Sequence, residues 1–151
     1  MSDILTERSG SILRIQLPFV NLGVVPEFGS SYSIPAWAGH IRASELFLLG
    51  LPFGATQAVE LGIVTRVVPD QELLAAATAT AEQLAAKPAG ALQASKRLLK
   101  RPAREQLEQA IRVENEVFAE LVRSADAKEA LTAFLEKRAP VFTKSKEPAT
   151  A

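Results

Sequence analysis

Cysteine is absent from this 151-residue chain, and histidine occurs once, at position 40. The lack of cysteine excludes disulfides, thiolate metal sites and a cysteine nucleophile. One histidine cannot form a histidine cluster within one subunit, so we expect no metal site. His40 follows a glycine and precedes an apolar stretch, which favours a helix start or an exposed position over a catalytic role.

An excess of either charge is also lacking, since 17 basic side chains are balanced by 17 acidic ones. Proteins that bind nucleic acids usually carry a basic excess, so we expect no nucleic-acid partner. No apolar run approaches the length of a membrane span. The first residues lack the basic start and apolar core of a secretory signal. We therefore expect no membrane partner and a cytoplasmic location.

Aromatic residues make up only 6% of the chain, whereas 48% of it is hydrophobic and alanine and leucine abound. This composition favours helices over a β-sandwich or barrel. The length suits one globular domain with a sizeable core. We assign that domain to residues 1–142 and expect residues 143–151, which have few apolar side chains, to be a flexible tail.

Short elements separated by glycine and proline are predicted in the first half. Apolar and polar residues alternate over residues 11–17, which predicts a strand, with Ile4 and Leu5 as its candidate partner. Two prolines predict an irregular loop over residues 18–26. Helices are expected over residues 32–37 (with Ser30 or Ser31 as the cap), 41–49 and 55–61, and a strand over residues 63–68.

From residue 70 onward the sequence predicts helices that end at prolines. Helix-forming residues continue across this whole half, and Pro88, Pro102 and Pro140 interrupt them. The predicted helices cover residues 70–86, 89–100, 104–122 and a last segment that begins at Ser124 or Asp126 and ends at residue 138.

Five cations lie around the break at Pro102. Four-residue spacing places Lys96 and Lys100 on one helix face, and Arg97 and Arg101 form an adjacent row. Arg104 follows after the proline. A solvated face is the favoured interpretation, and phosphate binding is the weaker alternative.

Glu27 is the only acidic residue between Glu7 and Glu45, and its neighbours in sequence are Val25, Pro26 and Phe28. A carboxylate in apolar surroundings can act as a general base. Alternatively, Glu27 is an acid at the N-terminus of the following helix, where the helix dipole favours negative charge. The residues by themselves favour this second interpretation.

A collinear set of segments carries a resemblance to a known family. The segments are 18–32 (PFVNLGVVPEFGSSY), 39–46 (GHIRASEL), 48–50 (LLG), 58–69 (AVELGIVTRVVP) and 134–142 (FLEKRAPVF). They resemble the crotonase superfamily of enoyl-CoA hydratases and isomerases, in particular its isomerase branch. The resemblance implies an enzyme that acts on fatty acyl-CoA thioesters, with coenzyme A entering only as part of the substrate. It also implies a homo-oligomer, with a trimer as the expected state.

The resemblance also implies roles for individual residues. In the isomerase branch the glutamate of a Pro-Glu-x-x-Ser-Ser-Tyr pattern is the base, which falls on Glu27. Many hydratases carry a catalytic glutamate at the position of Phe19, so its absence implies isomerase-like chemistry. Lys137 and Phe142 match positions that can contact the CoA nucleotide in relatives. On the residues alone, an exposed helix end for Lys137 and a packing role for Phe142 are favoured.

The resemblance has a gap between Leu17 and Pro18. Residues 2–17 resemble the first strand of the family, whereas Pro18 resembles a position far downstream. The missing middle includes the Gly-rich loop whose backbone N–H groups form the oxyanion hole, through an internal deletion or through drift within the family. We therefore expect an α/β, truncated crotonase-like fold with few β-strands and a predominantly helical C-terminal half.

Two functions follow from that gap. The first is an enoyl-CoA isomerase or hydratase by descent, with impaired activity and with weak or lost binding of acyl-CoA. The second is a non-catalytic remnant or a partner in oligomer assembly.

Overall fold

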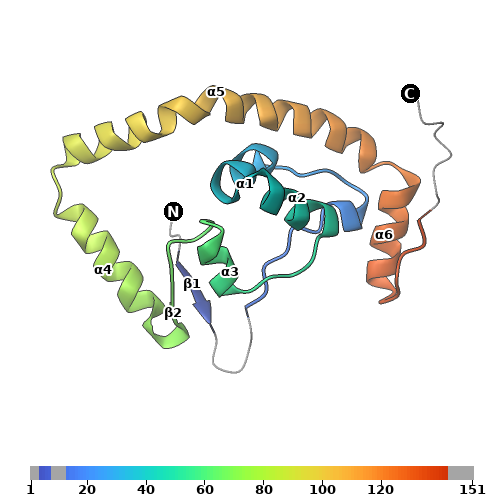
Figure 1. The fold of residues 1–151 in the computed structure, drawn as a ribbon, viewed down its shortest axis with the longest axis horizontal. Coiled ribbons are helices and arrows are strands. Elements are labelled where there is room, and N and C mark those ends of the chain that lie inside the picture. The colour runs from blue at the N-terminus through green and yellow to red at the C-terminus, as the bar shows by residue number, and fades with distance from the viewer. Residues whose placement is uncertain (1–3, 8–12, 143–151) are drawn as a thin grey trace.

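The structure is a computed structural model and describes residues 4–7 and 13–142 (Figure 1). The tail predicted over residues 143–151 lies outside the described residues. The elements in chain order are β1 (Ile4–Glu7), the 3₁₀ helix η1 (Val20–Leu22), α1 (Ser30–Ala38), α2 (His40–Leu49), α3 (Ala55–Glu60), β2 (Arg66–Pro69), the 3₁₀ helix η2 (Asp70–Glu72), α4 (Leu73–Ala85), α5 (Ala89–Leu121) and α6 (Ala125–Leu135). The prediction of an α/β chain with few strands and a helical second half is confirmed.

The two strands form a parallel pair, with Ile4 opposite Arg66 and Glu7 opposite Pro69. Parallel strands need a long crossover, and here α1, α2 and α3 lie between the two strands. The predicted pairing of Ile4–Leu5 with residues 11–17 does not occur among the described residues 13–17, and residues 11 and 12 lie outside the described residues. Among residues 13–17, only Ile15 pairs with another strand-like residue, through an antiparallel bridge to Phe53. The alternation in this segment reflects one face packed on the core, because Ile15 and Leu17 contact the core cluster.

The core lies between α1, α2 and α3. Its buried members are Ile34, Ala43, Leu46, Phe47, Phe53, Ala58, Leu61 and Val64. Helix α5 passes over α1 in a shallow arch, and α4 and α6 lie at its two ends (Figure 1). This core cluster therefore belongs to the first half of the chain, and α4, α5 and α6 of the second half form an arch around it (Figure 1).

Helix α5 is continuous, so the predicted break at Pro102 is wrong. Proline has a helical φ, and inside a helix it removes one backbone hydrogen bond and clashes with the carbonyl four residues earlier. These effects kink a helix or break it. Good helix formers surround Pro102 on both sides.

Several boundaries also differ from the predictions. The strand expected over residues 63–68 is shorter, because turns at residues 61–65 precede β2. The helix expected from residue 70 begins with η2. Of the two predicted starts of the last helix, Ser124 is the N-cap of α6, since its Oγ accepts the Ala127 N–H at 3.0 Å. Helix α6 ends at Leu135, three residues early, because Lys137 adopts a left-handed φ of 55°.

Within the described ranges, no helix has both the length and the apolar character of a membrane span.

The bend of α5 yields a stability prediction. We expect Pro102→Ala to raise the free energy of unfolding by about 1–3 kcal/mol, because alanine restores an N–H donor and removes the ring clash. Chemical denaturation followed by circular dichroism measures the effect. Pro88→Ala is the matched control, since Pro88 is the N-cap of α5 and needs no helical donor, and it should change stability little. Equal effects of the two substitutions would contradict this account.

Candidate active site

Glu27 lies on the loop that joins η1 to α1, at a tight turn. Phe28 and Gly29 both have left-handed φ angles, 59° and 71°. This conformation is unfavourable for a bulky residue such as Phe28, whose side chain is 84% exposed. The carbonyl of Glu27 accepts the N–H of Ser30 at 3.0 Å. A strained turn that is held by its surroundings therefore sets the direction of Glu27.

The side chain of Glu27 is half-buried. In the part of the chain that the structure describes, its carboxylate forms no hydrogen bond and no ion pair. Its oxygens are therefore available to an incoming proton. The alternative interpretation, an acid at the N-terminus of the following helix, also stays open, because Glu27 lies three residues before the start of α1. A different carboxylate forms the hydrogen bonds to the first amides of that helix.

That carboxylate is Glu114 of α5, which is only 5% exposed. One of its oxygens accepts the N–H of Gly29 at 2.6 Å, and the other accepts the N–H of Ser31 at 2.8 Å. The cap predicted from Ser30 or Ser31 is therefore wrong, because neither hydroxyl caps α1. Negative charge is favoured here, since a helix N-terminus presents free N–H groups and a positive dipole end.

Glu114 lies outside the motif segments of the sequence, so no motif identifies it as a functional residue. The available signal was its position on α5, where Leu107, Ile111 and Phe118 share a face with it at helical spacing. An acid on an otherwise apolar face must find donors when that face is buried. Without the fold, however, the spacing could not name Gly29 and Ser31 as those donors.

Gly29 lets α5 approach the turn closely. A β-carbon at this position would collide with Cδ1 of Leu107 and press on Ile111. The same glycine also supplies the left-handed φ. The turn therefore needs glycine for two independent reasons.

An open cavity of about 540 Å³ lies beside this loop. Val25 and Pro26 line it before Glu27, and Ser31 and Tyr32 line it after Glu27. The opposite wall is one face of α5 between Gln106 and Val117, and it includes Glu114. The lining is predominantly apolar, so the cavity suits a hydrocarbon chain better than a polar group.

Lys137 and Phe142 lie beyond the end of α6, and both are exposed. Neither lines the cavity beside the Glu27 loop. The structure thus brings the Glu27 loop to α5 and leaves these two residues at a separate place on this chain. Their exposure agrees with the favoured interpretation of Lys137 as a helix end, and Phe142 is only partly packed.

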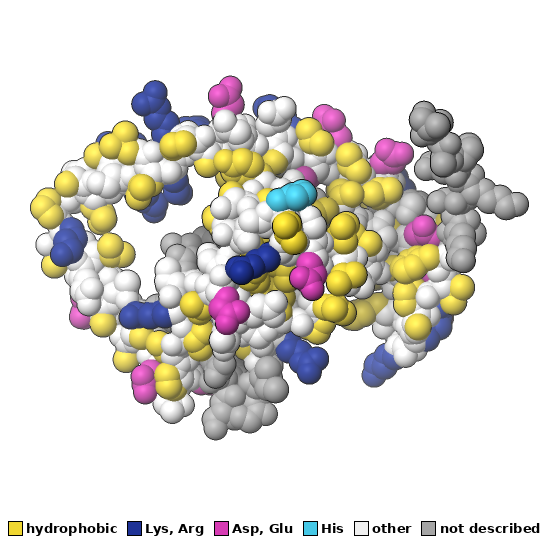
Figure 2. Space-filling model, viewed as in Figure 1, with side chains coloured by type: hydrophobic (Ala, Val, Ile, Leu, Met, Phe, Trp, Pro, Cys, Tyr) yellow, Lys and Arg dark blue, Asp and Glu magenta, His cyan; other side chains and the backbone are white. Residues whose placement is uncertain are grey.

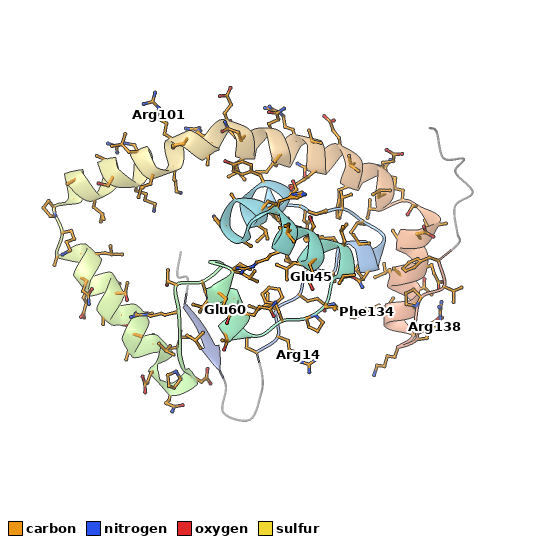
Figure 3. All side chains as sticks on the ribbon, in the orientation of Figure 1. Arg14, Glu45, Glu60, Arg101, Phe134 and Arg138 are labelled. Carbon is orange, nitrogen blue, oxygen red and sulfur yellow. The ribbon has the colours of Figure 1, made fainter. Side chains whose placement is uncertain are left out.

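An ion pair fixes the segment between Lys137 and Phe142. Arg138 donates to both carboxylate oxygens of Glu129, and the Val141 N–H donates to the same carboxylate at 2.9 Å. The side chain of Arg138 points back along α6 (Figure 3). The hydrogen bonds from Arg138 and Val141 lower the pKa of Glu129 to about 2.

The remaining candidates lie on the surface. Figure 2 shows the single histidine at the molecular surface, and His40 is the exposed first residue of α2. All five cations near Pro102 are exposed, and Arg104 pairs with Glu108 at 2.9 Å. No group of three potential metal ligands occurs among the described residues.

The Glu129 pair predicts a pH dependence. The pKa of Glu129 is about 2 in the folded chain and about 4.3 for a free glutamate. The pair therefore stabilises the segment above about pH 4.3, and this contribution is lost as the pH falls through 2. We expect the Val141 amide resonance to titrate near pH 2 by NMR.

The matched variants separate the two acids that contact Arg138. In Glu129→Gln the low-pH transition of Val141 should disappear. In Glu136→Gln it should remain, because Glu136 binds Arg138 but not the Val141 N–H. If the low-pH transition of the Val141 resonance were unchanged in Glu129→Gln, Glu129 would not be the group that titrates near pH 2.

Comparisons with known proteins match most of the chain to one family. The family model described as enoyl-CoA hydratase/isomerase matches residues 1–145. A probable enoyl-CoA hydratase, echA8, of Mycobacterium tuberculosis is 35% identical over 83% of this chain and 49% of its own length. The 1,2-epoxyphenylacetyl-CoA isomerase of Escherichia coli is 35% identical over 84% of this chain and 48% of its own.

Solved structures show the same relationship. The enoyl-CoA hydratase/isomerase of Pseudoalteromonas atlantica superposes with a TM-score of 0.83 at 36% identity, over 93% of this chain and 56% of that one. An enoyl-CoA hydratase of Mycobacterium avium subsp. paratuberculosis gives a TM-score of 0.83 at 29% identity. The chain spans about half the length of the relatives that it matches. It belongs to the enoyl-CoA hydratase/isomerase family of the crotonase superfamily, and its fold is a partial version of the fold of that family.

Proposed function

We propose that this chain carries the base of an enoyl-CoA isomerase, Glu27, and that its activity by itself is strongly impaired. The substrate would be a fatty acyl-CoA thioester with a double bond at carbon 3. Glu27 would take a proton from carbon 2 and return it to carbon 4, while the double bond moves to carbon 2. The observation that carries the proposal is a half-buried carboxylate with no partner among the described residues, on a strained loop. The neighbouring residues Pro26 and Ser31 of that loop line an apolar cavity.

Isomerisation is favoured over hydration because of Phe19. Its ring lies 6.0 Å from the ring of Phe47, centroid to centroid, and packs against the core. Hydration generally uses a second carboxylate to orient water, and a core phenylalanine cannot supply one. Phe19 therefore supports a reaction that needs one base.

The impairment follows from the enolate intermediate. Removal of the proton places negative charge on the thioester oxygen, which needs prepositioned donors. The N-terminus of α1 cannot provide them, because the amides of residues 29–33 already donate to Glu27, Gly29 and Glu114. Loss of one such donor typically lowers the rate by about 10²–10³-fold.

Lys137 and Phe142 would contact the CoA nucleotide, and no other cofactor is proposed. One cation and one exposed ring offer little to offset the entropy lost when a large, flexible ligand binds. We therefore propose weak or lost binding of acyl-CoA by the isolated chain. The cytoplasmic location expected from the sequence remains a prediction.

The alternative function is a non-catalytic remnant or an assembly partner, and the exposed apolar side chains favour it. Leu98 and Leu99 on α5 and Phe134 and Leu135 on α6 are all more than half exposed. Hydrophobic side chains reach the surface along α5 in Figure 2. Surfaces of this kind are typical of interfaces between protein chains.

Hydrogen–deuterium exchange at carbon 2 of a 3-enoyl-CoA tests the role of Glu27. In D₂O we expect the purified chain to exchange this position slowly and to give near-background amounts of the 2-enoyl product. Glu27→Gln should lower the exchange rate by about 10²-fold or more. Glu45→Gln, at an exposed acid of α2, is the control and should behave as wild type. Mass spectrometry measures both product and label.

Three outcomes separate the hypotheses. Exchange that depends on Glu27 without efficient turnover supports the proposal. Equal background rates in wild type and Glu27→Gln support the non-catalytic remnant. Rapid complete isomerisation that Glu27→Gln abolishes would show that the proposed impairment is wrong.

The assembly proposal has its own test. We propose a homo-oligomer, with a trimer as the state that the resemblance implies. Multi-angle light scattering at micromolar concentration should give a mass several times that of one chain, which is 16.2 kDa. Leu98→Lys and Leu99→Lys together should reduce that mass if α5 forms the interface. A compact monomer in the wild type would contradict oligomer formation.

A further inference from the structure

We infer that Glu114 is a positioning residue for Glu27, because its buried carboxylate holds the turn that carries this base. The inference rests on the proposed function, in which Glu27 takes the proton. Glu114 lies 85 residues from Gly29 in the chain, yet its carboxylate oxygen is 2.6 Å from that amide. The contact therefore joins the long helix α5 to the loop of the site.

The hydrogen bonds hold the turn at two points. Gly29 and Ser31 flank Ser30, and each donates its N–H to a different oxygen of Glu114. Two donors from one backbone turn fix both its position and its rotation relative to α5. Hydrogen bonds to a charged acceptor are shorter and stronger than neutral ones. The burial of Glu114 excludes the water that would otherwise compete for these amides.

The geometry gives Glu114 direct influence over Glu27, since only Phe28 separates Glu27 from Gly29. Phe28 is held at a φ of 59°, which a residue of this type rarely adopts without support. The Glu27 carbonyl is part of the same turn, through its hydrogen bond from Ser30. When the Gly29 amide is released, Phe28 can relax to a negative φ, and the direction of the Glu27 side chain changes with it.

A role for Glu114 as a helix cap would explain its two hydrogen bonds. It would not explain why this carboxylate lies beside both the Glu27 loop and the adjoining cavity. Glu114 also forms part of the wall of the cavity that adjoins the loop. The same α5 face supplies Leu107 and Ile111, which lie so close to Gly29 that a β-carbon there would meet both side chains. Helix α5 thus limits how closely the turn can approach it through apolar side chains, and it orients the turn through the Glu114 carboxylate.

The experiment compares Glu114→Gln with Glu116→Gln on the same helix. Glutamine keeps the volume of Glu114 but replaces one acceptor oxygen with a donor, so one amide loses its partner. Glu116 is exposed, and the substitution there serves as the control. By NMR we expect the Gly29 and Ser31 amides of Glu114→Gln to exchange with solvent about tenfold faster or more. In Glu116→Gln they should match wild type.

The second readout is the exchange of the carbon 2 proton of a 3-enoyl-CoA. For Glu114→Gln we expect the exchange rate at a fixed, subsaturating thioester concentration to fall about tenfold, because the orientation of the base is lost. Far-UV circular dichroism verifies that the variant is folded. In Glu114→Ala, millimolar formate or acetate should restore part of the rate and slow the two amides again, since a small carboxylate fits the vacated position.

The outcomes keep this inference separate from the proposed function. If Glu114→Gln loosens the two amides and the rate stays at the wild-type value, Glu114 is only a helix cap and the inference is wrong. If the amides do not change, it is also wrong. If wild type shows no exchange that depends on Glu27, the proposed function fails. The Glu27 side-chain resonances then decide about positioning: they should shift in Glu114→Gln and not in Glu116→Gln, and unchanged resonances would overturn it.

Discussion

The contact between the Glu114 carboxylate and the start of α1 is the constraint on which the arrangement of the two halves depends. Helix α5 is a long arch, and its first part lies beside α4 and away from the core (Figure 1). Its second part is tied to the core where Gly29 and Ser31 donate to Glu114. A buried carboxylate is costly unless donors surround it, so this contact admits one register of α5 on α1. The Glu27 loop follows from that register.

The sequence could predict those features that depend on local chemistry. Glycine and proline residues predicted the short helices of the first half. Ser124 was one of the two predicted starts of the last helix, and its hydroxyl caps that helix by accepting an amide three residues away. Glu27 was found through a motif, and the motif lies on a turn with two left-handed residues. Family membership was predicted from collinear segments and is confirmed by the family model.

The features that could not be predicted are those that distant residues decide. The partner of β1 is β2, which follows three helices later, and alternation in residues 11–17 contains no information about that choice. Pro102 was expected to end a helix, yet α5 continues through it, with good helix formers on both sides. Glu114 had the clearest hidden signal, since an acid on an apolar stripe requires donors, but only the fold identifies Gly29 and Ser31 as those donors.

The partial fold contains the loop of the proposed base, Glu27, without the rest of the fold that its relatives have. A two-stranded parallel sheet leaves two strand edges without partners among the described residues, and parallel sheets are normally covered on both faces. Relatives with about twice this length share the fold of this half. In this chain the amides of Gly29 and Ser31 at the start of α1 donate their hydrogen bonds to Glu114. They therefore cannot also donate to an enolate oxygen. The Glu114 carboxylate, which orders the Glu27 loop, thus accepts the hydrogen bonds of the nearest free amides, those at the start of α1. In the function that we propose, efficient catalysis would therefore require oxyanion donors from outside the described residues. This half of the fold would supply the orientation of Glu27 by itself.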